Sequence, residues 1–101
     1  MAMHIISRKK LLEATREHGA LAGPLDAWYR TAKTANWKSL QDVRRVYSHA
    51  DGVSVGERTY TVFNVAGQHY RLIVEIFYKN QTILVRHVLT HAEYDKGDWK
   101  T

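Results

Sequence analysis

The feature that most constrains this chain is the stretch from Tyr60 to Asp95, in which three apolar runs are separated by two short polar turns. Runs rich in Val, Ile, Tyr and Phe and bounded by Gly or Asn are typical of strands joined by hairpins. The pattern predicts strands over Thr59–Ala66, His69–Tyr78 and Thr82–Thr90. Gly67-Gln68 and Asn80-Gln81 are the expected two-residue loops, so the stretch should fold as an antiparallel meander.

These loops also predict which residues face one another across the strands. In the expected register Asn64 faces Arg71, Glu75 faces Arg86, and Arg71 faces Thr90. Because side chains alternate across a strand, one face of the sheet would be almost wholly apolar and would include His87 and Leu89. The other face would be mixed, with polar groups gathered at one end around Asn64 and Arg71.

The first half of the chain predicts the cover for that apolar face. Apolar residues at helical spacing favour helices over Arg8–His18, Leu25–Ala35 and about Ser39–Tyr47, after a short strand at Met3–Ser7. Residues 48–56 are expected to form a polar turn region. The order indicates an α+β fold with helices packed on one face of the sheet, and residues 1–101 are expected to form one domain. Trp28, Tyr29 and Trp37 are expected to be core aromatics.

Composition limits the possible partners and compartments. The formal net charge is +5 and the sequence pI is about 9.6, which favours a polyanionic partner such as RNA. Cysteine is absent, so disulfides and thiolate metal sites are excluded. No apolar run has the length of a membrane span and no signal peptide is recognisable, so we expect a cytoplasmic protein without membrane contact.

One group of residues in the sequence has the chemistry for cleaving RNA without a metal ion or other cofactor. Such cleavage needs a base near the 2′-hydroxyl, cationic donors on the phosphate and an acid for the leaving oxygen. His91 suits the base or acid, Arg71 suits the phosphate, and Tyr94 or Lys96 could transfer a proton if its pKa were lowered. His87 and His91 are four residues apart, but they fall at a strand end and no metal site is predicted.

Other residues and other functions remain open at this point. Asn64, Lys79 and Arg86 are candidates for binding RNA, although Arg86 opposite Glu75 equally suits a cross-strand ion pair. The basic face could belong to a non-catalytic module that binds RNA or the ribosome. It could also belong to an interaction domain for an acidic protein.

Three segments resemble a known family, the HigB-type toxins of bacterial toxin–antitoxin modules. They are Phe63–Val65, Tyr70–Ile73 and especially Val88–Asp95, with its T-H-x-E-Y-D pattern. The resemblance implies a RelE-like fold with helices on a twisted antiparallel sheet. It also implies an mRNA interferase that cuts message in the ribosomal A site without metal, with Arg71 on the scissile phosphate and His91, Tyr94 and Lys96 as catalytic candidates. The implied partner is a helix-turn-helix antitoxin similar to HigA, through which alone operator DNA would be bound.

Overall fold

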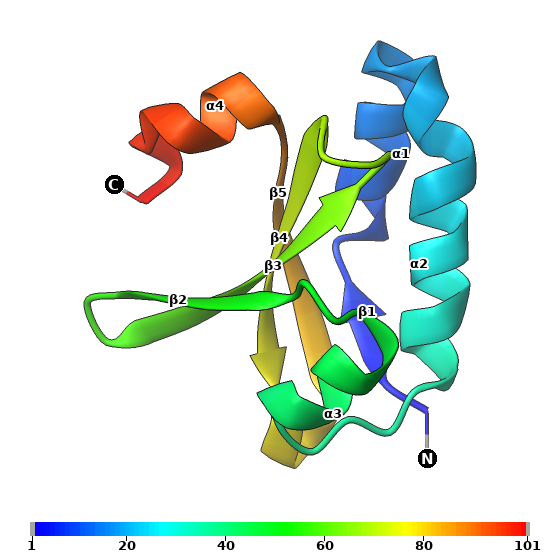
Figure 1. Ribbon diagram of the computed structural model, residues 1–101. Coiled ribbons are helices and arrows are strands. Elements are labelled where there is room, and N and C mark those ends of the chain that lie inside the picture. Colours follow the sequence, from blue (N-terminus) through cyan, green and yellow to red (C-terminus); the bar gives the residue numbers. More distant parts are fainter. Residues whose placement is uncertain (1, 101) are drawn as a thin grey trace.

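A five-stranded sheet runs through the computed structural model, which describes residues 2–100 (Figure 1). The strand order is β1-β5-β4-β3-β2. The strands are β1 (His4–Ile6), β2 (Asp51–Val55), β3 (Arg58–Val65), β4 (Tyr70–Phe77) and β5 (Thr82–Thr90). β1 pairs with β5 in parallel, and all other pairs are antiparallel. The predicted meander is therefore confirmed as β3-β4-β5, and the complete sheet is mixed.

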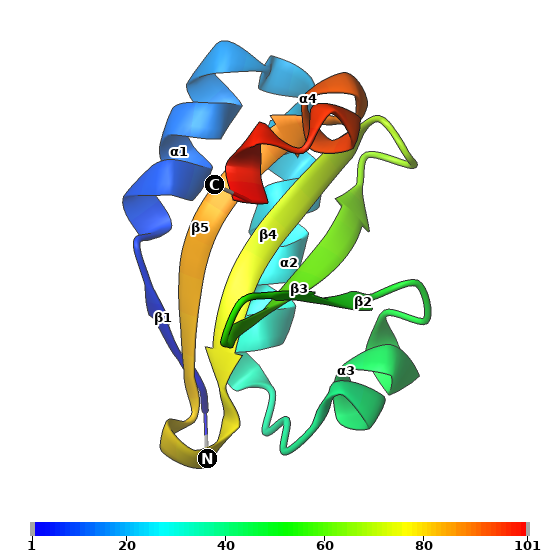
Figure 2. The same ribbon diagram turned by 90° about the vertical axis from the view of Figure 1, so that its left-hand side faces the viewer.

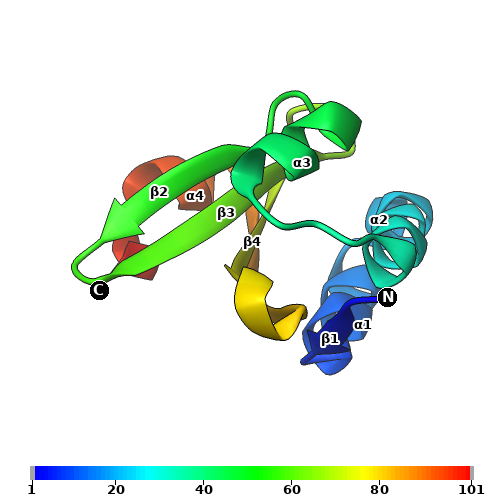
Figure 3. The same ribbon diagram turned by 90° about the horizontal axis from the view of Figure 1, so that it is seen from below.

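The helices lie on both sides of this sheet. They are α1 (Arg8–Glu17), α2 (Ala22–Thr34), α3 (Leu40–Val46) and α4 (His91–Lys96). Figure 3 shows α1 and α2 together on one side and α4 on the other. The α+β fold with helices on one apolar face is confirmed, whereas α4 is an element that sequence reasoning missed. No helix in the described part of the chain is long and apolar enough to cross a membrane.

The main core lies between the sheet and α1, α2 and α3. Trp28 on α2 meets Phe63 on β3 edge to face, with ring centroids 5.5 Å apart. Tyr47 and Trp37 contact the same Phe63 ring at 5.2 and 6.4 Å. Such aromatic pairs stabilise a core beyond the area they bury. The predicted burial of Trp28 and Trp37 is confirmed, and Tyr29 is half-buried beneath the Arg8 guanidinium.

The register predicted for the first hairpin is confirmed, but the register predicted for the second hairpin is wrong. Asn64 pairs with Arg71. On the next strand pair Glu75 lies opposite Leu84 instead of Arg86, because the connection is a 3₁₀ turn at Tyr78–Asn80 followed by Gln81 with φ 51°. The four-residue connection moves every partner on β5 along by one or two positions. Arg71 therefore faces Leu89.

A bulge in β5 produces a second correction. Val74 pairs with Val85 but the preceding Ile73 pairs with His87, so Arg86 is the extra residue. A single inserted residue reverses the alternation of side chains beyond it. Leu89 therefore packs on the face away from the helices, and Val88 takes its place against the main core. The expected position of His87 and Leu89 on the helix-covered face is wrong.

The far face of the sheet has a small core of its own. Tyr60, Val62, Ile73 and Trp99 are buried there, and Tyr94 packs beside them. The stretch expected to be a polar turn contains β2, which is an edge strand of the sheet. Figure 2 shows α4 and the C-terminal turn lying across the ends of β4 and β5. The C-terminal segment is thereby fixed next to the polar end of the sheet.

Candidate active site

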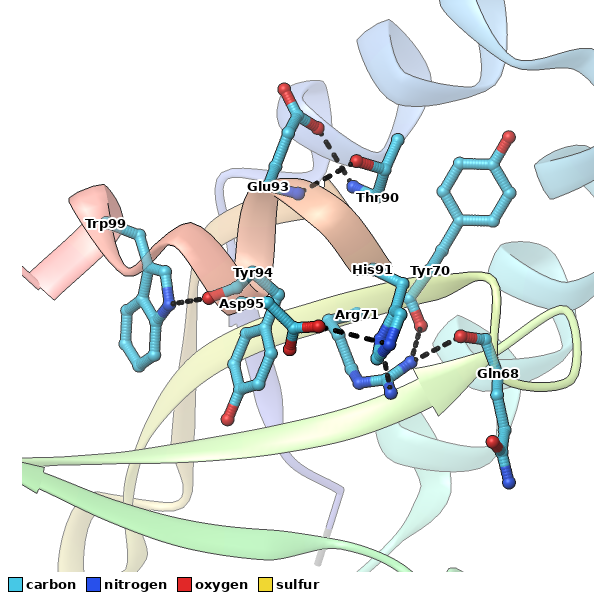
Figure 4. A network of polar contacts seen from close by, with 9 residues as sticks. All are labelled: Gln68, Tyr70, Arg71, Thr90, His91, Glu93, Tyr94, Asp95 and Trp99. Carbon is cyan, nitrogen blue, oxygen red and sulfur yellow. Dashed lines mark hydrogen bonds and ion pairs between the residues drawn. The ribbon is translucent and has the colours of Figure 1, made fainter.

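Arg71, at the start of β4, is held by the neighbouring turn. Its Nη1 donates to the carbonyl oxygens of Gln68 at 2.8 Å and Tyr70 at 3.2 Å. Its Nη2 lies 3.0 Å from Nδ1 of His91 (Figure 4). The side chain is half-buried, so the guanidinium is oriented by fixed carbonyl groups while part of it still faces solvent. The predicted meeting of Arg71 and His91 is observed.

A capping box places His91. Thr90 Oγ1 accepts a hydrogen bond from the Glu93 backbone N–H at 3.1 Å, and Glu93 Oε1 accepts one from the Thr90 N–H at 2.9 Å. These bonds start α4 at His91, whose own N–H donates to the His69 carbonyl at 2.8 Å. A Thr followed three residues later by Glu is a sequence signal for a helix start. This signal is present at Thr90–Glu93, where no helix was predicted.

The contacts of His91 assign its tautomer. An arginine only donates hydrogen bonds, so Nδ1 accepts and carries no hydrogen. Nε2 then carries the hydrogen, which points to Asp95 Oδ2 at 3.1 Å. The imidazole thus lies between a cation at one ring nitrogen and a carboxylate at the other. An acidic group placed in this way stabilises the imidazolium that forms when the ring accepts a proton.

Tyr94 completes the convergence. Its ring stacks on Trp99 with the ring centroids 5.4 Å apart, and the guanidinium carbon of Arg71, on β4, lies 5.6 Å from the centroid of the Tyr94 ring. Burial raises the pKa of the phenol, Asp51 and Asp95 act in the same direction, and Arg71 opposes them. A raised pKa is the opposite of the lowering considered from the sequence. Tyr94 therefore keeps its proton at neutral pH.

Arg71 and Tyr94 line one open cavity of about 620 Å³, the Arg71 cavity, and His91 contacts Arg71 beside it. Its lining includes Arg44, His49, Asp51, Asn64, Arg71 and Tyr94. Arg44, His49 and Asp51 were not among the candidates, because the stretch that holds His49 and Asp51 was interpreted as a polar turn. Arg44 is held by the Ala50 carbonyl, to which its Nε donates at 2.9 Å, and its Nη2 lies 3.9 Å from Asp51. The cavity therefore holds a second guanidinium.

The other candidates lie elsewhere. Lys96 is 4.0 Å from Asp98 and lines a separate hollow with His87, so it is not brought to Arg71. Burial, followed by Lys10 and Arg86, lowers the pKa of His87. Glu75 forms ion pairs with Arg86 at 3.6 Å and Arg58 at 3.4 Å.

Lys79 lies in the 3₁₀ turn at the opposite end of β4 from Arg71. Asn64 does line the Arg71 cavity. Within residues 2–100, no group of three or more His, Cys, Asp or Glu side chains could hold a metal ion.

Replacing Thr90 by Ala should loosen the start of α4. Losing one N-cap oxygen costs about 1 kcal/mol, and the loss would fall on the turn that carries His91 and Tyr94. We expect faster amide exchange over residues 91–96 with little change in the rest of the sheet. Thr90→Ser keeps the hydroxyl and should exchange at the wild-type rate. Equal protection in both variants would contradict a capping role.

Comparison with known proteins defines the class and then the family. Residues 21–97 match the family model described as HigB_toxin, RelE-like toxic component of a toxin-antitoxin system. The fold and the match thus define a RelE-like toxin, a class of protein that implies a cognate antitoxin. The chain belongs to the HigB toxin family.

Two curated relatives extend over most of the chain. The mRNA interferase HigB of Escherichia coli O6:H1 (strain CFT073) is 32% identical over 94 residues, which are 93% of this chain and 90% of that protein. The mRNA interferase toxin HigB of Escherichia coli K12 is 30% identical over 93 residues, which are 92% of this chain and 88% of that protein.

Proposed function

We propose that this chain is an mRNA interferase that cleaves message by attack of a 2′-hydroxyl on the adjacent phosphate, on the ribosome and without a metal ion. The names of its relatives support the activity. The observation that carries the proposed mechanism is that Arg71, which lines the cavity together with Tyr94, contacts both Tyr94 and His91.

Arg71 holds the scissile phosphate in this proposal. Its guanidinium is permanently charged and its planar fork matches two phosphate oxygens. Nη1 is engaged by two carbonyl groups, whereas Nη2 is engaged by His91. An arriving phosphate oxygen can therefore take the place of the imidazole on Nη2 without disturbing the bonds that orient the guanidinium. Arg44, across the cavity, supplies further positive charge for the RNA backbone.

His91 acts as the base. Displacement from Arg71 frees the Nδ1 lone pair, which accepts the proton of the attacking 2′-hydroxyl. The imidazolium that results keeps its Nε2 hydrogen directed at Asp95, 3.1 Å away. A carboxylate in that position stabilises the charged ring. The 2′-oxygen forms a bond to phosphorus while the bond from phosphorus to the 5′-oxygen breaks.

Tyr94 acts as the acid. Its phenol is protonated at neutral pH, as an ordinary tyrosine is, and burial raises its pKa further. It donates that proton to the departing 5′-oxygen. The products are a 2′,3′-cyclic phosphate and a 5′-hydroxyl, and water restores the phenol and the imidazole. Lys96 has no step in this mechanism. We propose that Lys96, like Lys79 and Arg86, contacts the RNA backbone away from the scissile phosphate.

The proposed partners follow from charge and family. A net charge of +5 suits a protein that works on ribosome-bound message. We propose that the cognate antitoxin is similar to HigA, with a helix-turn-helix domain, and that operator DNA is bound only through it.

Cleavage by Tyr94→Phe on programmed ribosomes tests the proposal. Wild-type protein should create new 5′ ends in a message, mapped by primer extension. The Phe variant keeps the ring contacts and should bind message as well as wild type does. It should cleave up to about 100-fold more slowly, which is at the low end of the loss expected for a general acid, because water can reach the site and replace the phenol. Tyr29→Phe, outside the site, is the control. Binding by wild type without new 5′ ends would instead identify a non-catalytic module.

A further inference from the structure

We propose that a hollow beside the Arg71 cavity binds one nucleobase of the message, and that the Gln68 and Asn64 amides read the edge of that base. This inference rests on the proposed function. The hollow, called here the Gln68 hollow, has a volume of about 390 Å³, within the usual range of pockets for small organic molecules. A base next to the cleaved phosphate is a ligand of that class.

The Gln68 hollow and the Arg71 cavity share a wall. Ser48, His49, Ala50 and Asn64 line both. A nucleotide whose phosphate sits on Arg71 has its base only a sugar away, so an adjoining hollow is where a flanking base can be placed. The shared wall makes the two spaces one continuous surface for a single strand.

The rest of the lining suits a flat, uncharged ring. Tyr47 supplies aromatic surface at the hollow, and Phe63, which is only 1% exposed, lies beneath it in contact with the Tyr47 and Trp28 rings. Val46 stands at the rim and is 55% exposed, an unusual degree for a large apolar residue in this chain. The lining contains no Lys, Arg, Asp or Glu. Unpaired bases are held by stacking against such apolar and aromatic surfaces.

Two amides supply the polar recognition. An amide side chain offers a donor pair and an acceptor, and so can pair with the polar edge of a base. Asn64 is the register partner of Arg71. Gln68 binds Arg71 through its main-chain carbonyl, and Figure 4 shows its side-chain amide pointing away from the guanidinium. The same residue therefore orients the Arg71 guanidinium through its carbonyl and also lines the neighbouring hollow.

Mapping the 5′ ends that Gln68→Ala produces across a pool of messages tests this inference. The substitution leaves the carbonyl that holds Arg71, so cleavage should continue. The base composition next to the cut should change, and the preference for the favoured base should fall by one to two orders of magnitude, in the range of about 5- to 150-fold that a good amide–base pair supplies. Gln41→Ala, an exposed glutamine on α3 outside the hollow, should cut with the wild-type composition.

A second measurement uses message with an abasic nucleotide beside the cut site. Removal of the base should slow wild-type cleavage by a similar factor and should slow Gln68→Ala little further, because the contact is already gone. Unchanged base composition in Gln68→Ala, or equal slowing at every site, would overturn the base hollow while wild-type cleavage still upholds the proposed function. No cleavage by wild type would instead refute the proposed function itself.

Discussion

Replacing Arg71 by Lys is expected to slow message cleavage by about 10²–10³-fold, the loss typical of one oriented donor to a developing phosphate charge. Lysine keeps the charge but lacks the planar fork, so it cannot bind the Gln68 and Tyr70 carbonyls and a phosphate oxygen at once. The measurement is the single-turnover rate on ribosome-bound message. Binding should weaken much less, because the remaining basic residues still contact the RNA.

Arg30→Lys is the matched control for Arg71→Lys. Arg30 forms an exposed ion pair with Asp26 on α2, far from the cavity, and such surface pairs contribute little to stability. Its cleavage rate should equal that of wild type. If Arg71→Lys cleaved at the rate of Arg30→Lys, the guanidinium would have no role in the chemistry.

Phe63→Ala is expected to lower the free energy of unfolding by about 3–5 kcal/mol, the range for truncating a large buried aromatic. The ring is 1% exposed and contacts Trp28, Trp37 and Tyr47. Its loss opens a cavity where α2 and α3 meet the sheet. Because small domains have only about 5–15 kcal/mol of stability, urea unfolding should shift strongly to lower concentration.

Phe77→Ala provides the comparison within the same sheet. Phe77 ends β4 and is 43% exposed, so its truncation removes little buried surface. We expect a change below about 1 kcal/mol, as for most substitutions at exposed sites. Similar urea midpoints for the two variants would mean that the aromatic cluster around Phe63 does not hold the helices to the sheet.

Local sequence patterns predicted most of the scaffold. The β3–β4 hairpin and the pairing of Asn64 with Arg71 follow from alternation around Gly67. The amphipathic spacing of α1 and α2 also gave the correct covered face. Such features depend on residues close together in the chain, which is why a sequence pattern can reveal them.

The second hairpin failed for a physical reason. The left-handed backbone conformation of Gln81 and the bulge at Arg86 are features that the residue types Gln and Arg do not predict. They moved Leu89 to the far face, where it packs with Trp99. An edge strand as short as β2, with alternating exposed residues, likewise has little apolar pattern to detect.

The candidate site was predicted in part. Arg71, His91, Tyr94 and Asn64 do come together, since Arg71 and Asn64 share a register and α4 begins immediately after β5. Lys96 was placed with them by sequence proximity, but one turn of helix directs it to a different hollow. Arg44 and His49 reach the cavity only through the packing of α3 and β2, which no local pattern specifies.

The most direct test of the mechanism is cleavage of message that carries a single 2′-deoxy nucleotide on the 5′ side of the preferred cut. We expect no cleavage at that bond, whereas unmodified message should give a 2′,3′-cyclic phosphate and a 5′-hydroxyl end. Cleavage of the deoxy bond at the normal rate would contradict attack by the 2′-oxygen, and with it the roles assigned to Arg71, His91 and Tyr94.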